Sequence, residues 1–351
     1  MTSNLSSILS PKRLARLPSF STFAAAGPDS HGFLQGQLTN DVNGADGSHH
    51  QRTGYCSPKG RLLTTMIQWK TGEYAWTHLL PAESVDRIGK RLKMYVLRSK
   101  VTVLPADQGL TALGLWGDPG EALSHLSPIE TEGLAFKISD FITESAAKGT
   151  ESTSGVWLLV DRPCPTLGIR GWLVGPPEQI AKAVASLSDL PELPESAWIF
   201  SEIQSGKAWV WEATQDLFVP QMVNFELIRG VSFTKGCYPG QEVVARSQYL
   251  GKLKRRTFRM NLSKEQSALI GGPITPMVGM DVWSENVANE PCGRVVAAAP
   301  AFSSEGVQTE DTALLVELTM DAWAAGGLRL QDPSGPRLLA AELPYALAAA
   351  A

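Results

Sequence analysis

The chain has 351 residues, of which 43% are hydrophobic and 19% are charged, and its formal net charge is −4. This composition is typical of a globular protein with room for two or three domains, and it excludes an intrinsically disordered chain. The small excess of acid gives no overall attraction to nucleic acid or to an anionic membrane, and no run of about 18 apolar residues predicts a membrane-spanning helix. We therefore expect no direct nucleic-acid partner and no membrane association.

The four cysteines lie far apart in the chain, as Cys56, Cys164, Cys237 and Cys292. They include no C-x-x-C pair, which argues against a zinc or iron–sulfur site within the chain and against a secreted disulfide scaffold. Residues 1–18 contain basic residues and serines but no acid, and we predict a disordered tail there. A short organellar leader is the alternative. We expect a cytoplasmic protein, with the mitochondrial matrix as the alternative.

Residues 20–103 predict a compact α+β unit. Alternating and helical apolar patterns predict strands at 20–26, 62–69, 76–80 and 96–103 and helices at 30–38 and 81–94. The order strand, helix, strand, strand, helix, strand is typical of a ferredoxin-like unit. His49 and His50 fall in a polar stretch, where a solvated loop is expected in preference to a metal site.

The rest of the chain predicts more short strands and a change of architecture near residue 251. Strands with Gly- and Pro-rich turns are expected over 111–174, followed by a helix at 176–187 and another that starts at Trp198. Short segments at 254–261, 280–284, 294–298 and 312–318 then predict a small β-barrel. The chain contains no Walker loop and no Gly-x-Gly-x-x-Gly, so nothing supports a nucleotide site of those kinds.

The most informative segment runs Lys235-Gly-Cys-Tyr-Pro-Gly-Gln-Glu-Val-Val-Ala-Arg246. Gly236 and Gly240 permit a tight turn, and the residues from Gln241 onward have helical spacing. A helix N-terminus with Lys235 close by favours an anion and lowers the pKa of a neighbouring thiol, which predicts a reactive or anion-facing Cys237. The alternative is a tight inter-domain loop that holds a buried, inert cysteine, and the spacing leaves both open.

Two other features have a structural and a functional interpretation. A basic run follows the cysteine segment, and its members are Lys252, Lys254, Arg255, Arg256 and Arg259. It predicts either a solvated strand face or a patch for an anionic ligand tail or RNA phosphates. Trp198 is predicted either to pack in the core or to stack on a heteroaromatic ring.

The segment Lys235–Arg246 resembles the signature of YgfZ-type folate-binding proteins, which are relatives of the glycine-cleavage T-protein (aminomethyltransferase, GcvT). Three further blocks, at 33–42, 56–61 and 97–101, are also similar to this family. The resemblance implies a GcvT-like α+β fold, with two intertwined α+β lobes at 19–250 and a C-terminal β-barrel domain at 251–351. It implies tetrahydrofolate or another reduced folate as cofactor. It also implies iron–sulfur assembly proteins and iron–sulfur client enzymes as partners, among them radical-SAM enzymes that modify tRNA.

The resemblance also assigns site residues. The family's functional loop falls here on Lys235, Gly236, Cys237, Tyr238, Gly240, Gln241, Glu242 and Arg246. The folate contacts fall on Trp198, Phe20, Gln204, Asn40 and Asp41.

The chain departs from the T-protein in its acidic residues. Thr64 and Thr65 stand where the T-protein carries the acids used in aminomethyl transfer, and a threonine has no charge to stabilise a cationic group. Gln204 stands near the position of a pterin-holding glutamate, with Glu202 as an alternative. We therefore expect an accessory factor for iron–sulfur cluster assembly or repair and not an ordinary aminomethyltransferase. The alternative is a folate-dependent one-carbon transferase that uses Asp41.

Overall fold

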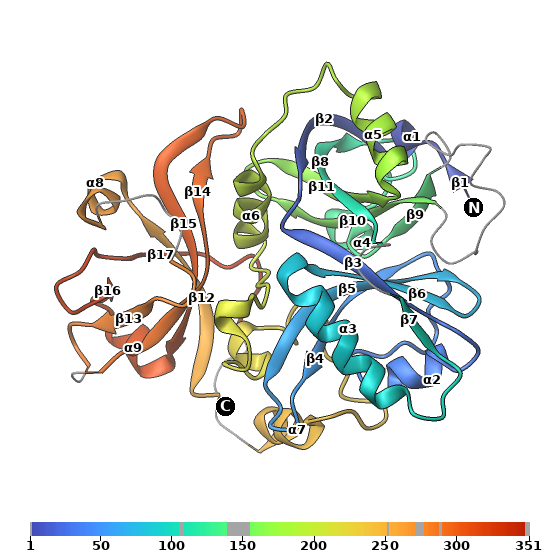
Figure 1. Ribbon diagram of the computed structural model, residues 1–351. Coiled ribbons are helices and arrows are strands. Elements are labelled where there is room, and N and C mark those ends of the chain that lie inside the picture. The colour runs from blue at the N-terminus through green and yellow to red at the C-terminus, as the bar shows by residue number, and fades with distance from the viewer. Residues whose placement is uncertain are drawn as a thin grey trace.

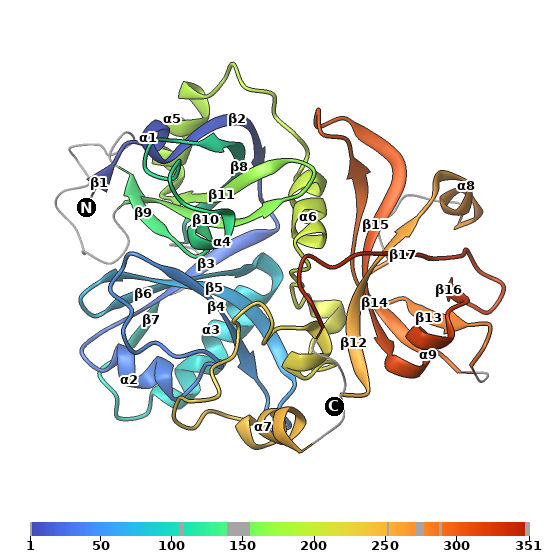
Figure 2. The ribbon, with the colours of Figure 1, turned by 180° about the vertical axis from the view of Figure 1, so that it is seen from behind.

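The structure, a computed structural model, describes residues 2–104, 109–138, 155–250, 253–270, 277–287 and 290–347. These residues form two α+β lobes and a C-terminal sheet, and helix α6 (Glu195–Gln204) lies between the second lobe and that sheet (Figures 1 and 2). No helix among the described residues is long and apolar enough to cross a membrane.

Lobe 1, residues 20–104, is a five-stranded antiparallel sheet in the order β4-β5-β6-β3-β7. Its elements are β3 (Phe20–Ala26), α2 (Ser30–Gln35), β4 (His50–Cys56), β5 (Leu62–Gly72), β6 (Ala75–Pro81), α3 (Ala82–Val96) and β7 (Thr102–Leu104). The order β5-β6-β3-β7, with a helix after the first strand and another before the last, is the predicted ferredoxin-like arrangement. Strand β4 adds one edge to it.

Two predictions in lobe 1 are corrected. The polar stretch at 49–50 leads directly into β4, and His50 is buried against lobe 2 through a hydrogen bond from its ring to the Val160 carbonyl. The strand predicted at 96–103 is shorter, because α3 continues to Val96 and Leu97 then takes a positive φ of 47°. That left-handed residue turns the chain before β7 begins.

Lobe 2 is a six-stranded sheet in the order β1-β9-β10-β11-β8-β2, in which β1 pairs parallel to β9 and the other pairs are antiparallel. Its strands are β1 (Thr2–Ser3), β2 (Leu9–Arg16), β8 (Thr111–Pro119), β9 (Ala135–Ile138), β10 (Val156–Cys164) and β11 (Gly168–Gly175). Its helices are α1 (Leu5–Ile8), α4 (Pro128–Thr131) and α5 (Pro177–Ser186).

The predicted disordered tail is wrong for residues 2–16, because they are part of lobe 2. Strand β2 pairs along β8, and Leu9 and Leu14 are buried in the core of the lobe. The basic residues that suggested a tail are on the exposed side, where Lys12 pairs with Asp118. Pairing along β8 and the burial of Leu9, Leu14 and Ala15 explain the ordered strand.

The C-terminal sheet is antiparallel in the order β16-β13-β14-β15-β12-β17. Its strands are β12 (Arg255–Leu262), β13 (Asp281–Ser284), β14 (Gly293–Phe302), β15 (Gln308–Thr319), β16 (Leu328–Leu330) and β17 (Leu339–Ala341), with α8 (Lys264–Ser267) and α9 (Met320–Ala325) beside them. In the described part of the chain β16 and β17 remain edges of this sheet, so the predicted small barrel is instead a curled half-barrel (Figure 1).

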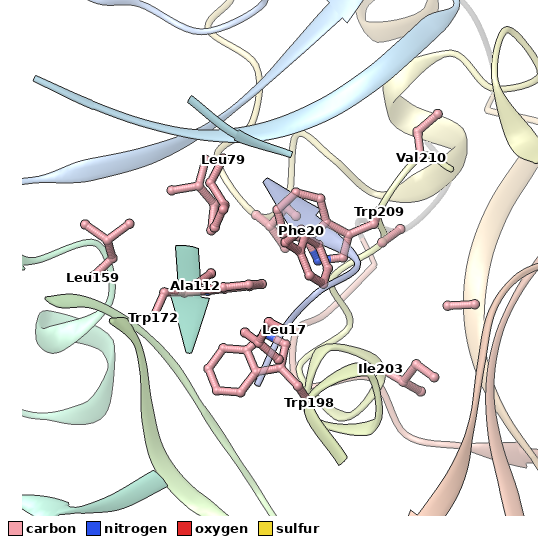
Figure 3. Packing of buried hydrophobic residues seen from close by; sticks show 14 of the residues in the cluster. Leu17, Phe20, Leu79, Ala112, Leu159, Trp172, Trp198, Ile203, Trp209 and Val210 are labelled. Carbon is pink, nitrogen blue, oxygen red and sulfur yellow. The ribbon is translucent and has the colours of Figure 1, made fainter. Parts of the chain in front are cut away.

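Aromatic side chains fill the centre, where the two lobes meet α6. Figure 3 shows Phe20, Trp172, Trp198 and Trp209 packed together there. The contacts are edge-on, with ring centroids 4.7 Å apart for Trp172 and Trp198 and 5.0 Å apart for Phe20 and Trp172. This packing joins lobe 1, lobe 2 and α6 in one hydrophobic core.

Candidate functional site

The cysteine loop presents its thiol to solvent. Cys237 is exposed, whereas the other three cysteines are buried. The loop ends at Gly240, whose φ of 79° is left-handed, and the predicted helix begins at the next residue as α7 (Gln241–Tyr249). The interpretation of Cys237 as a buried residue is therefore wrong, and a reactive or anion-facing thiol stays a prediction.

Two glycines fix the position of this loop. The carbonyl oxygen of Ser57 is 2.4 Å from where a Cβ on Gly240 would lie, and the Cα of Gly60 is 2.5 Å from it. Gly60 also has a positive φ of 71°, and a Cβ there would be 2.7 Å from the Cβ of Val243 on α7. The 57–60 turn and the start of α7 thus approach more closely than any side chain allows.

A third segment, at 38–40, fastens the other end of the loop. The ammonium of Lys235 donates hydrogen bonds to the carbonyls of Leu38 and Asn40, at 2.5 and 3.0 Å. The Ser232 N–H donates to the carbonyl of Thr39 at 3.0 Å. Three of the family-like blocks, at 33–42, 56–61 and 235–246, therefore converge around Cys237, although almost 200 residues separate the first from the last.

Lys235 has an unusual environment for an amine. Burial lowers its pKa to about 8, and the charge of Asp41 opposes that shift. Its Nζ lies 5.3 Å from the centroid of the Tyr238 ring, and burial raises the pKa of that phenol. With two carbonyl acceptors and a ring face as neighbours, Lys235 anchors the loop to lobe 1.

The other predicted residues around the loop have identifiable partners. Asn40 donates from Nδ2 to the carbonyls of Arg52 and Arg229, both at 2.7 Å. The Asp41 carboxylate accepts from Gln35 at 2.9 Å and from the Asn43 N–H at 2.8 Å. These contacts hold the turn that receives Lys235.

On the first turns of α7 the charged side chains are exposed. Glu242 and Arg246 pair there at 2.8 Å, and Gln241 is the first residue of the helix.

The predicted folate contacts Trp198 and Phe20 are packed in the core. Trp198 is 0% exposed and Phe20 is 4% exposed. Trp198 makes edge-on contacts with Trp116 and Trp172, and Phe20 packs on Trp172 and Trp209 (Figure 3). These rings present no open face, so this part of the centre does not fit a pterin in the conformation described. Trp198 therefore packs in the core, as the structural alternative predicted.

The other residues predicted near the centre also have partners within the protein. Gln204 accepts from Arg259 at 2.5 Å and so faces the C-terminal sheet. Thr64 and Thr65 are fully buried, and the Thr65 hydroxyl accepts from the Val210 N–H at 3.0 Å.

The basic run does not form a free patch. Arg255 pairs with Glu317 and Arg256 with Glu226, Arg259 donates hydrogen bonds to Gln204 and to the Glu342 carbonyl, and Lys252 lies outside the described residues. Because Arg256 is buried, this strand is packed and is not the solvated face that one interpretation predicted.

A buried ionic network behind the tryptophans was missed by the sequence analysis. Its members come from lobe 1, lobe 2 and the end of α6, and they are Arg52, Glu132, Asp161, Arg170, Glu202 and Lys207. Burial alone would raise the pKa of Asp161, but Lys207, Arg170 and Arg52 outweigh it and hold the pKa well below its ordinary value. Arg52 Nε and Nη1 have no hydrogen-bond partner among the described residues.

A cavity of about 810 Å³ lies between the two lobes, at the edge of the aromatic core. Its size falls in the range of about 300–1,000 Å³ that is usual for small-molecule sites. Lobe 1 contributes residues 46–48 and 70–73, and lobe 2 contributes residues 134–137 and Trp157.

The chain is similar in sequence to several bacterial proteins called tRNA-modifying protein YgfZ. It is 28% identical to the one from Edwardsiella ictaluri, with 95% of this chain and 93% of that protein covered. The protein of Klebsiella pneumoniae is 29% identical, with 96% and 94% covered. That of Colwellia psychrerythraea is 32% identical over 72% of each chain. No protein-family model matches the chain.

The fold is similar to that of the glycine cleavage system aminomethyltransferase T from Bartonella henselae. The TM-score is 0.66, the sequence identity is 14%, and the comparison covers 97% of this chain and 87% of that one. This similarity establishes the GcvT-like α+β fold. With the convergence of the three blocks around Cys237 and the 32% identity to the Colwellia protein, the sequence comparison settles the family: the chain belongs to the YgfZ family.

Proposed function

We propose that this protein is an accessory factor that supports iron–sulfur cluster assembly or repair in client enzymes, including enzymes that modify tRNA. Reduced folate, such as tetrahydrofolate, is its small-molecule ligand in this proposal, and Cys237 is its partner-facing group. The observation that carries the proposal is the exposed thiol on a loop that two distant segments, at 38–40 and 57–60, hold in place.

The position of the loop favours a role of Cys237 at a partner protein over a reaction in the interior of this protein. The cavity between the lobes is lined by the β5–β6 hairpin and β9, whereas α7, which follows Cys237 in the chain, lies at the lower edge of lobe 1 in Figure 1. A single thiolate cannot hold an iron–sulfur cluster, so a partner would supply the other ligands. Iron–sulfur assembly proteins and their client enzymes are the partners that this chemistry implies.

The buried threonines favour an accessory factor over a one-carbon transferase. Thr64 and Thr65 bring no charge to the centre, and the Thr65 hydroxyl already accepts a backbone hydrogen bond. Asp41, the carboxylate proposed for the transferase, is engaged by Gln35 and by a backbone N–H. The names of the relatives agree with a role in tRNA modification, and their bacterial origin favours the cytoplasm.

The test is rescue of a bacterial strain that lacks its own YgfZ protein. Wild-type protein should restore the activity of iron–sulfur enzymes in cell extracts, and Cys237→Ala should not, although both accumulate to the same level. Gln248→Ala, which changes an exposed side chain on α7 outside the functional loop, is the control and should rescue fully. Equal rescue by Cys237→Ala would refute the proposed role of the thiol.

A further inference from the structure

The end of α3 and the turn after it, residues 90–100, gather positive charge, and we call this segment the α3 tip. From residue 87 to residue 106 the sequence contains six lysines and arginines and no acid, although the whole chain has a net charge of −4. Two acids border the tip: Asp86 is exposed one turn before it, and the Asp29 carboxylate accepts the Lys100 backbone N–H at 2.7 Å. Four cations of the tip are exposed and form no ion pair with any described residue, namely Lys90, Lys93, Arg98 and Lys100.

The α3 tip also exposes three large apolar side chains. Met94 is 64% exposed, Tyr95 is 42% exposed and Leu97 is 85% exposed. Met94 shares one face of α3 with Lys90 and Lys93, because positions three and four apart are neighbours on a helix, while the opposite face of α3 packs into lobe 1. Exposed apolar side chains with charges around them are typical of a surface that docks another protein, in which the apolar centre becomes buried and the charges select the partner.

A short series of contacts connects the α3 tip to the cysteine loop. The Arg91 guanidinium lies 6.0 Å from the centroid of the Tyr55 ring, and Tyr55 forms a β-bridge with Leu38. The Leu38 carbonyl in turn accepts the hydrogen bond from Lys235 that fastens the loop. Figure 1 shows the last turns of α3 and helix α7 on the lower side of lobe 1. A protein held on the tip would therefore lie on the same side of the molecule as Cys237.

We propose that the α3 tip is the docking surface for an acidic protein, which it holds beside the exposed thiol of Cys237. This inference rests on the proposed function and specifies the iron–sulfur partner as one that presents carboxylates around an apolar patch. A protein fits the tip better than RNA does, because Met94 and Leu97 are aliphatic and cannot stack on a base. Exposed ion pairs are individually weak, so replacing two of the lysines by acids should weaken docking about tenfold.

The experiment measures iron–sulfur enzyme activity in a strain that lacks its own YgfZ protein and expresses full-length variants at a low and at a high level. The variants are Lys90→Glu with Lys93→Glu, and separately Met94→Ser with Leu97→Ser. The matched control, Lys182→Glu with Arg337→Glu, makes the same change in net charge at exposed residues on α5 and beside β16. All of these variants should unfold at the urea concentration of wild type, because the changed side chains are exposed.

Docking is also followed directly, with a photo-reactive benzoylphenylalanine in place of Met94 and identification of the cross-linked protein by mass spectrometry. Purified total tRNA and vesicles of phosphatidylserine and phosphatidylcholine are the probes for the other anionic occupants. Neither should bind wild-type protein more tightly than the Lys90/Lys93 variant.

At low expression both tip variants should give up to about tenfold less enzyme activity than wild type and the control. At high expression the difference should disappear, because mass action fills a weakened docking surface, whereas Cys237→Ala should fail at both levels. The cross-link should join the tip to an iron–sulfur protein of net negative charge, and the Lys90/Lys93 changes should abolish it.

Four results would overturn the inference alone: full rescue by the Lys90/Lys93 variant at low expression, no cross-link, a cross-link to a protein that is not acidic, or tighter binding of tRNA or vesicles to wild type than to that variant. Rescue by Cys237→Ala would refute the proposed function instead.

Discussion

The close approach between Gly240 and the 57–60 turn gives a sharp prediction about the cysteine loop. In Gly240→Ala, the new methyl group would meet the Ser57 carbonyl oxygen at 2.4 Å and Gly60 at 2.5 Å, both of them backbone atoms that cannot rotate away. The residue would also have to keep a φ of 79°. The left-handed backbone costs roughly 1–2 kcal/mol for a residue with a Cβ, and overpacking costs about 1–3 kcal/mol more. We therefore expect a loss of about 3 kcal/mol in the free energy of unfolding.

Gly236→Ala is the matched control, four residues away in the same loop. A Cβ on Gly236 would have no atom within 4 Å, and its φ lies outside the left-handed range. The change should leave stability within about 0.5 kcal/mol of wild type, as is usual for surface substitutions. Urea unfolding measures both variants, and the rate at which a disulfide reagent modifies Cys237 reports whether the loop has moved.

Gly240→Ala should be clearly less stable than Gly236→Ala and should show an altered rate of thiol modification. If the two variants unfold at the same urea concentration and their thiols react alike, then the loop is not held by this contact. The convergence of segments around Cys237 would then lose its physical basis.

Three further predictions concern the thiol, the buried charges and the amine. In native protein, mass spectrometry after brief alkylation should find Cys237 modified and the other three cysteines protected, because only Cys237 is exposed; early modification of a second cysteine would contradict the structure. Asp161→Asn should cost about 3–5 kcal/mol at pH 7, because it leaves buried cations unpaired, whereas Glu242→Gln on the surface should have no measurable effect in the same unfolding assay. Because the pKa of Asp161 is depressed in the folded protein, its ionised carboxylate stabilises the fold fully above the unfolded pKa of about 3.9, and this stabilisation is lost as the pH falls below that value. The free energies of unfolding of wild type and Asp161→Asn should therefore converge in acid. The folded pKa of Lys235, about 8, lies below its unfolded value of about 10.4, so wild-type stability relative to Lys235→Met should rise between these pH values; a flat difference would mean that the amine is not buried.

Local patterns were enough to predict many of the elements. The strand predicted at 20–26 is β3, and the helix predicted from Gln241 is α7. The ferredoxin-like order of lobe 1 follows from these local patterns, since that order of elements restricts how the strands can pair. The spacing left open whether Cys237 is buried, and the structure shows that it is exposed.

Features that depend on distant partners were not predictable from the sequence. Arg52, Asp161 and Glu202 would be assigned to the surface on polarity alone, yet all three are buried because the Arg52 guanidinium pairs with both carboxylates. The family resemblance assigned Trp198 to a ligand, but its neighbours in space fill both sides of the ring. Whether the C-terminal strands close a barrel depends on pairing between β16 and β17, which local sequence does not specify.

If the cysteine loop presents Cys237 to iron–sulfur partners that act on tRNA, loss of the thiol should be visible in the tRNA itself. Mass spectrometry can quantify modified nucleosides in tRNA from a strain that lacks its own YgfZ protein and expresses either wild-type protein, Cys237→Ser or Gln248→Ala, which changes an exposed residue of α7 outside the loop. Cys237→Ser, folded and abundant, should leave nucleosides made by iron–sulfur enzymes depleted, whereas wild type and Gln248→Ala should restore them and nucleosides made by other enzymes should stay constant. Full restoration by Cys237→Ser would rule out a role for the thiol.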